Sequence, residues 1–263
     1  GYSSYIQWVV TIFMLLFGVN FNAYYLLLFR KFKKAVSMEE VKAYFGIIIA
    51  STLIIFFNIF KYAKPAGTLF RDAAFQVASI ITTTGFATVD FDMWPQTSKT
   101  ILVMLMFIGA CAGSTGGGIK VSRIVILLKT LSKEISSYIH PRSIKKIKME
   151  GKTVAHDVVR STNVYFITYF IIFSFSVLLL SFEGKDAVTN FTAVAATINN
   201  IGPGLELVGP TCNFGIFNIF SKYILMFDML AGRLELFPLL ILAHPSIIKS
   251  MVLYRKQGKR KQL

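Results

Sequence analysis

Cysteine and histidine are scarce in this chain, with two Cys and three His among 263 residues. Two cysteines are too few for the disulfide framework of a small secreted domain, so we expect Cys111 and Cys212 to be unpaired thiols. His140, His156 and His244 are far apart and lack the spacing of a metal site. These absences argue against a disulfide scaffold and against a His- or Cys-based metal centre.

Acidic side chains are also few, because 13 Asp and Glu face 28 Lys and Arg, for a formal net charge of +15. So basic a chain could bind nucleic acid, but the basic residues alternate with poorer segments. Residues 30–42, 120–160 and 249–261 hold five, ten and six Lys/Arg, whereas 61–99 and 183–222 hold four and two. Lys/Arg-rich loops of membrane proteins stay in the cytoplasm. We therefore expect a membrane protein and no nucleic-acid partner.

Long stretches of low charge are abundant, and 54% of all residues are hydrophobic. Five stretches are long enough to reach across a bilayer, which takes about 20 helical residues. They are residues 5–29, 44–60, 101–128, 164–182 and 214–243. With the basic loops inside, the first, third and fifth spans run inward, and the second and fourth run outward. The sequence predicts an all-α polytopic membrane protein in contact with lipid.

Two segments between these spans are too short to cross the bilayer and too apolar for free loops. Residues 67–81 and 186–198 fit re-entrant helices, which enter the membrane and stop midway. Each is followed by a turn that contains glycine, and the two glycines are 117 residues apart. The turn residues are Thr82, Thr83, Thr84, Gly85 and Phe86 in one copy and Asn199, Asn200, Ile201, Gly202 and Pro203 in the other. We expect two repeats of one plan: a span, a re-entrant helix with its turn, and a second span.

The end of a re-entrant helix suits a cation. Its last carbonyls carry about half a negative charge, and a following glycine allows successive carbonyls to face one axis. Rings of such carbonyls replace the hydration shell of the ion in potassium filters. A single turn of this kind would be interpreted as an ordinary polar loop. Two turns in register behind similar helices favour a selectivity filter.

A glycine-rich segment interrupts the third span. It comprises Gly113, Ser114, Thr115, Gly116, Gly117 and Gly118, and Lys120 follows it. Four glycines in six residues do not hold a helix, since each costs about 1 kcal/mol relative to Ala. The spacing matches a nucleotide-binding P-loop, but Ile119 stands where that motif requires Lys, and no strand precedes it. Non-helical backbone at membrane depth lies inside protein or beside a water-filled cavity, so we predict a gating loop that lines the pathway.

Arg233 lies in the last predicted span, close to mid-membrane. An arginine at that depth is costly and marks a functional site by default. Asp228 and Glu235 are five and two residues away, so neither shares its helical face. We expect Arg233 to contact carbonyls of the glycine-rich segment. A structural ion pair with Asp228 or Glu235 is the alternative.

These motifs resemble those of the Trk-type potassium uptake proteins, which belong to the Trk/Ktr/HKT superfamily of cation transporters. The similar segments are residues 78–86, 113–120, 199–205 and 232–235. Members of the family have four repeats of helix, pore loop and helix, and this chain is similar to the last two. The implied units are residues 1–36, the closing helix of a preceding repeat with a basic loop; 37–150, a third repeat with a broken inner helix; and 151–263, a fourth repeat with a basic tail.

The resemblance also implies a function. Potassium would be taken up through a filter with one glycine per repeat, and the transported K⁺ would be held at Thr83, Thr84, Asn200 and Ile201. Arg233 would face an intramembrane gate, without a cofactor and without catalysed chemistry. The implied assembly is a homodimer in the bacterial cytoplasmic (inner) membrane. A regulatory subunit with nucleotide-binding domains would bind it on the cytoplasmic side.

Three alternatives stand beside this interpretation. Sodium-linked transporters of the Ktr type share the pore motifs and differ in their dependence on external sodium. A multi-pass membrane enzyme would need catalytic carboxylates or histidines gathered at one interface, and the sequence shows no such cluster. A membrane scaffold for a cytoplasmic partner would leave the duplicated turns unexplained.

Overall fold

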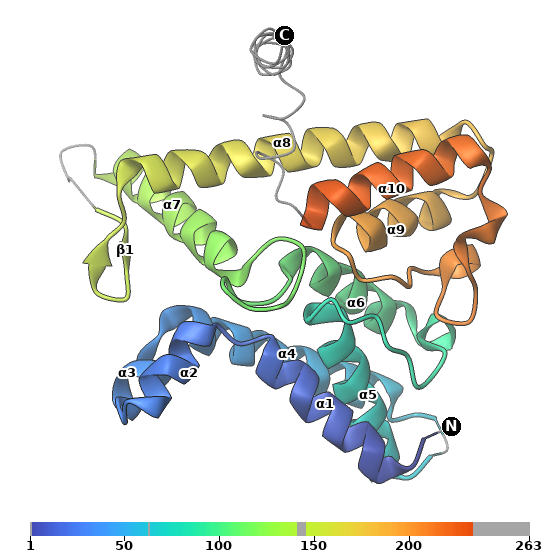
Figure 1. Cartoon of the computed structure of the whole chain (residues 1–263), viewed down its shortest axis with the longest axis horizontal. Helices are drawn as coiled ribbons and strands as arrows, with labels where there is room; N and C mark the ends of the chain where they lie inside the picture. Colours follow the sequence, from blue (N-terminus) through green and yellow to red (C-terminus); the bar gives the residue numbers. More distant parts are fainter. Residues whose placement is uncertain (1, 63, 141–145, 234–263) are drawn as a thin grey trace, which may run out of the picture.

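The computed structural model describes residues 2–62, 64–140 and 146–233, which form helices and one short hairpin (Figure 1). The helices are Ser4–Phe17 (α1), Phe21–Leu28 (α2), Phe32–Ser37 (α3), Glu39–Ile59 (α4), Ala66–Ile81 (α5), Gln96–Ile108 (α6), Val121–Ile139 (α7), His156–Ser181 (α8), Ala187–Ile198 (α9) and Ile219–Arg233 (α10). Three 3₁₀ turns are Phe91–Met93, Glu206–Val208 and Phe214–Ile216. Strands Lys148–Met149 (β1) and Lys152–Thr153 (β2) pair antiparallel. The predicted helical class is confirmed. Glu235, His244, the end of the last predicted span and the basic tail lie outside the described residues.

Two helices of the described part, α4 and α8, are long and apolar enough to cross a membrane. Helices α1 and α2 would add a third span, but they meet at a bend of 92°. The first predicted span, residues 5–29, is therefore broken rather than one continuous helix. At the break, Gly18 lies so close to the Tyr44 hydroxyl of α4 that a side chain there would overlap it. Asn20 then begins α2 by accepting a hydrogen bond from the Asn22 amide at 2.9 Å.

The predicted third and fifth spans also differ from continuous helices. The third is divided into α6 and α7 by residues 109–120, as its glycine content predicts. The fifth begins at Ile219 rather than at residue 214. Asn213 and Asn218 explain that shift, because Asn213 caps the 3₁₀ turn and the Asn218 side chain accepts from the Ser221 amide at 2.9 Å, inside the first turn of α10.

The two predicted re-entrant helices are α5 and α9, and both lie inside the molecule. α5 packs against α1, α4 and α6, and α9 packs against α8, α10 and α6. Their second halves are buried on every side, and the equivalent residues Ala78 and Ala195 are both fully buried. Because other helices surround the second halves of α5 and α9, the turns that follow them begin in the interior, with Thr82 and Asn199 buried.

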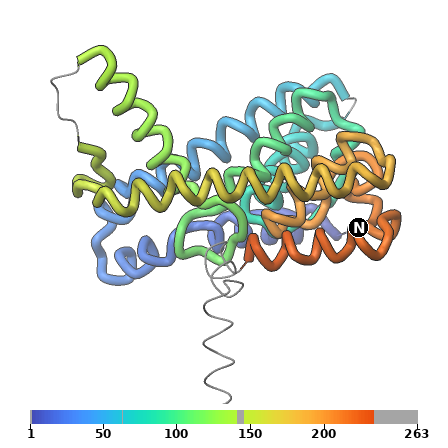
Figure 2. Tube along the Cα trace, turned by 90° about the horizontal axis from the view of Figure 1, so that it is seen from above, coloured from blue at the N-terminus to red at the C-terminus, as the bar shows by residue number. Residues whose placement is uncertain are grey.

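Charge separates the two ends of the molecule. The hairpin, α3 and the far end of α7 lie together at the left in Figure 1, and the loops before α6 and α10 lie at the right. At the right-hand end Lys99 pairs with Asp92 and Glu206 at 3.6 and 3.9 Å. Figure 2 shows α8 running between the two ends, with the loop that joins α6 to α7 near the middle. We expect the end with the hairpin to face the cytoplasm.

Candidate functional site

The turns after α5 and α9 have the same backbone hydrogen bonds at positions 117 residues apart. The Thr84 amide donates to the Ser79 carbonyl at 2.9 Å, and the Ile201 amide donates to the Ala196 carbonyl at 2.8 Å. Each bond reaches back past the end of its helix and turns the chain inward. The two turns are therefore copies of one structure, in the register that the sequence predicts.

Unusual backbone angles occur at matching positions in both turns. Thr83 and Asn200 have φ of 56° and 57°, and Gly85 and Gly202 have φ of 76° and 115°. Positive φ is rare for threonine and costs free energy, so such residues gather at functional sites. The predicted dependence on glycine conformation is confirmed at Gly85 and Gly202.

The two turns lie against each other. A side chain at Gly85 would overlap the Ile201 carbonyl oxygen and would come within 3.3 Å of Pro203. In the first turn, the Ser79 hydroxyl donates to the Phe86 carbonyl at 2.5 Å. Phe86 is 58% exposed. The structure thus brings the two predicted groups of turn residues to one place, with Phe86 at its edge.

A side chain of α8 and a main-chain carbonyl of α10 hold the second turn. Asn199 is fully buried and is hydrogen-bonded to the Tyr169 hydroxyl, with its amide nitrogen 2.8 Å from that oxygen. The Asn200 amide nitrogen donates to the Met229 carbonyl at 3.1 Å. The second turn is therefore fixed to two helices, α8 and α10.

The glycine-rich segment, residues 113–118, lies directly against both turns, and we call it the glycine loop. The Gly117 amide donates to the Thr83 hydroxyl at 2.6 Å. Side chains at Gly117 and Gly118 would come within 2.8 Å of the Asn199 carbonyl and side-chain oxygens respectively. The glycines are therefore needed for close approach to the turns as well as for breaking the helix.

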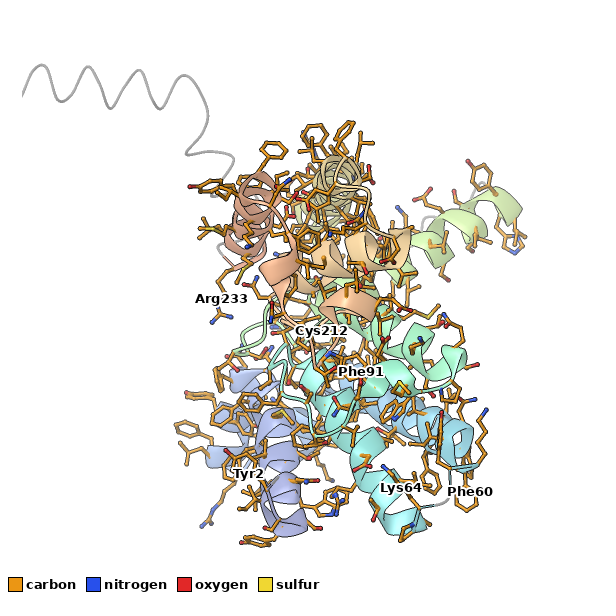
Figure 3. All side chains as sticks on the ribbon, turned by 90° about the vertical axis from the view of Figure 1, so that its right-hand side faces the viewer. Tyr2, Phe60, Lys64, Phe91, Cys212 and Arg233 are labelled. Atoms are coloured by element: carbon orange, nitrogen blue, oxygen red, sulfur yellow. The ribbon has the colours of Figure 1, made fainter. Side chains whose placement is uncertain are left out.

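Arg233 reaches the glycine loop, as predicted. Its Nη1 donates to the Thr115 carbonyl at 3.2 Å, and Figure 3 shows the side chain extending from the end of α10. Gly232, the residue before Arg233, allows α10 to lie against α9, because a side chain there would overlap the Ile198 carbonyl at the end of α9. The alternative ion pair with Asp228 is not formed among the described residues: Arg233 bonds the Thr115 carbonyl, and the Asp228 carboxylate accepts from the Ser176 hydroxyl at 2.8 Å. The alternative partner Glu235 lies outside the described residues.

Lys120, two residues after the glycine loop, is a second cation that contacts it. Its ammonium group donates to the Gly116 carbonyl and lies 3.4 Å from the Gly117 carbonyl. A cavity of about 330 Å³ borders the loop, lined by Lys120, Arg123 and Arg233 among others. Positive charge is thus concentrated beside the loop, where a free cation would be repelled.

One residue of this site, Glu40, is not predicted from the sequence. Glu40 is 2% exposed and accepts hydrogen bonds from the amides of Ala112 and Ser122, on either side of the glycine loop. An acidic residue at the start of an apolar span is ordinarily a solvated helix cap. Nothing in the local pattern separates Glu40 from its neighbour Glu39.

Comparisons with known proteins identify relatives of this chain. The family model TrkH, described as a cation transport protein, matches residues 49–250. The Trk system potassium uptake protein TrkH of Salmonella typhimurium is 36% identical over 250 residues, which cover 93% of this chain and 51% of the relative. That of Vibrio parahaemolyticus is 40% identical over 214 residues, or 80% and 44% of the two chains. The crystal structure of the potassium transporter TrkH from Vibrio parahaemolyticus has a TM-score of 0.84 at 36% identity, covering 93% of this chain and 53% of that one. The chain spans about half the length of these relatives.

Proposed function

Because the chain belongs to the TrkH family of cation transport proteins, we propose that it forms part of a pore for potassium uptake. It would supply two turns of the selectivity filter and the gate below them. The observation that carries this proposal is the contact of two equivalent turns with each other and with one glycine loop. The relatives named above are potassium uptake proteins and a potassium transporter rather than enzymes.

The filter would work through main-chain oxygens. Helices α5 and α9 end at the turns, and the partial negative charge of their last carbonyls attracts a cation. A potassium ion would exchange its hydration shell for carbonyls of Thr83, Thr84, Asn200 and Ile201. Two turns enclose only part of such a ring, so equivalent turns would come from the remaining half of a longer protein. The three units proposed are residues 1–36, 37–150 and 151–263. No cofactor takes part, because K⁺ is the cargo.

The gate would work through backbone and charge together. A potassium ion leaving the filter would meet the glycine loop, whose carbonyls already accept hydrogen bonds from Lys120 and Arg233. A potassium ion could not bind these carbonyls while Lys120 and Arg233 occupy them, because like charges at short range repel strongly in a low dielectric. Passage would therefore require the middle of the loop to leave the pathway. The membrane potential, about 2.3 kcal/mol per charge per 100 mV, would drive the ion inward.

The proposed setting is the bacterial inner membrane, crossed several times by the protein. The basic segment of residues 129–160 would face the cytoplasm, where the protein would bind a regulatory subunit with nucleotide-binding domains and form a homodimer. Lys129 supports a defined surface there, because it contacts Glu39 and donates to the Lys148 carbonyl of the hairpin at 2.7 Å. A hairpin tied in this way presents a fixed surface to a partner.

The complete protein, expressed in bacterial cells that lack their own potassium uptake, tests this function. We expect growth at low external potassium and uptake of rubidium that is independent of external sodium. A Cys212→Ser variant is the matched control, because Cys212 is exposed and outside the site, and it should behave like the wild type. Absence of uptake by protein that reaches the membrane would contradict the proposal. Uptake that requires external sodium would replace it with the Ktr-type alternative.

A further inference from the structure

Glu40 is a buried carboxylate with three hydrogen-bond donors around it. It lies in the first turn of α4 and is 2% exposed. One carboxylate oxygen accepts from the Ala112 amide at 2.6 Å and from the Ser122 amide at 3.1 Å. The other accepts from the Asn20 side chain at 3.1 Å. Both oxygens are thus satisfied by groups that are distant in the sequence.

The three donors belong to the two breaks in the helical spans. Asn20 lies in the bend between α1 and α2, Ala112 comes just before the glycine loop, and Ser122 lies in the first turn of α7. The first amides of a helix have no partner within the helix. Lys120, at the N-cap of α7, makes no capping bond through its side chain. Glu40 therefore caps α7 from another helix, and a negative charge is favourable at that position.

The bend between α1 and α2 also runs along the glycine loop. The Cys111 amide donates to the Gly18 carbonyl at 3.0 Å, and the Phe21 amide donates to the Gly113 carbonyl at 3.1 Å. These bonds fix the beginning of the loop, and the Ser122 amide, in the first turn of α7 beyond the end of the loop, is fixed by Glu40. The middle of the loop has attachments of its own, to the Thr83 hydroxyl, to Lys120 and, through the Thr115 amide at 3.4 Å, to the Phe17 carbonyl at the end of α1. Glu40 itself holds the two flanks of the loop.

We propose that Glu40 is a positioning residue that fixes both ends of the glycine loop to the bend between α1 and α2. The inference rests on the proposed role of this loop as the gate. With its ends fixed, the loop opens only through movement of its middle, and it returns to the same closed position. Without the carboxylate, buried amides on both sides of the loop lose their acceptor, which favours a displaced loop.

The test uses the complete protein in liposomes without a regulatory subunit. Glu40→Gln keeps the size of the side chain but replaces one acceptor oxygen with an amide nitrogen. That donor would face either the Asn20 side-chain nitrogen or the backbone amides of Ala112 and Ser122, which are donors themselves. We expect potassium flux to rise roughly five- to tenfold, with an unchanged potassium/sodium ratio. Adding Asn20→Asp supplies an acceptor for the new amide and still allows the cap on Asn22. The double variant should return flux to within about twofold of the wild type.

Glu39→Gln is the matched control, because Glu39 is the neighbouring acid but 37% of its side chain is exposed and its partner is Lys129. It should leave flux unchanged. Cys111 gives a second readout, since it is fully buried beside the loop. In a Cys212→Ser background, a small thiol reagent should label Cys111 slowly in the wild type, faster in Glu40→Gln and slowly again in the double variant.

The proposal is overturned if folded Glu40→Gln protein keeps both the wild-type flux and the slow labelling of Cys111. It is also overturned if Asn20→Asp restores neither, because the effect would then be a general loss of packing. Faster labelling of Cys111 with unchanged flux would support the anchoring by Glu40. That result would instead contradict the role of the glycine loop as the gate.

Discussion

Gly85→Ser is expected to remove most of the preference for potassium over sodium in the complete protein. Gly85 has φ of 76°, where a side chain is strained, and the new Cβ would overlap the Ile201 carbonyl oxygen of the second turn. The two turns would have to separate, which moves the carbonyls that bind the ion. Such strain costs about 1–2 kcal/mol, so the potassium/sodium ratio should fall about tenfold or more. Ion flux into liposomes under each cation gradient measures this ratio.

Substitutions at two other glycines serve as comparisons for Gly85→Ser. Gly202→Ser should lower the ratio less, because φ is 115° there but no described atom lies within 4 Å of the new Cβ. Gly67→Ser should leave the ratio unchanged, since Gly67 lies in the first turn of α5 with open space around it. A wild-type ratio in Gly85→Ser and Gly202→Ser, with both proteins folded, would show that the turns are not the filter.

Arg233→Gln is expected to raise ion flux about tenfold or more without changing selectivity. The guanidinium donates to the Thr115 carbonyl of the glycine loop, and a hydrogen bond from a charged group contributes about 1.5–3 kcal/mol. Its loss favours the open position of the loop, whereas the filter is a separate site. Fluxes of potassium and sodium in liposomes measure both quantities. Lys152→Gln, an exposed basic residue on the hairpin, is the control for the loss of one positive charge.

A double variant distinguishes two roles for Arg233. Deleting part of residues 113–118 should also raise flux. If Arg233 acts by holding the loop, adding Arg233→Gln to the deletion should change little, because the loop is already removed. If the two effects multiply, Arg233 acts as a separate electrostatic barrier to cations, and its role in holding the loop is contradicted.

Local patterns were sufficient for the parts of the site that depend on local chemistry. The apolar segments before Thr82 and Asn199 are too short to span the membrane, and this predicts the short helices α5 and α9. The glycines of the loop predict the break between α6 and α7 through their low helix propensity. A lone arginine in an apolar span needs a hydrogen-bonding partner, and this predicts the contact of Arg233 with the glycine loop.

Other features depend on tertiary contacts that one sequence does not reveal. Gly18 and Gly46 both lie in apolar runs, yet Gly46 is helical within α4 with open space around it, whereas Gly18 lies in a bend. The Tyr44 hydroxyl, from another helix, occupies the space beside Gly18, so the need for glycine there is not visible in the local sequence. Glu39 and Glu40 are likewise identical in sequence terms, and only the packing of α4 against the glycine loop buries Glu40.

Anomalous diffraction from crystals of the complete protein, grown or soaked with thallium or rubidium, tests the central claim most directly. The account predicts an ion coordinated by main-chain oxygens of Thr83, Thr84, Asn200 and Ile201, on the side of the turns away from the glycine loop. Excess potassium should displace it, and excess sodium should not. An anomalous signal found only elsewhere, with none at these carbonyls, would contradict the assignment of the two turns as a potassium filter.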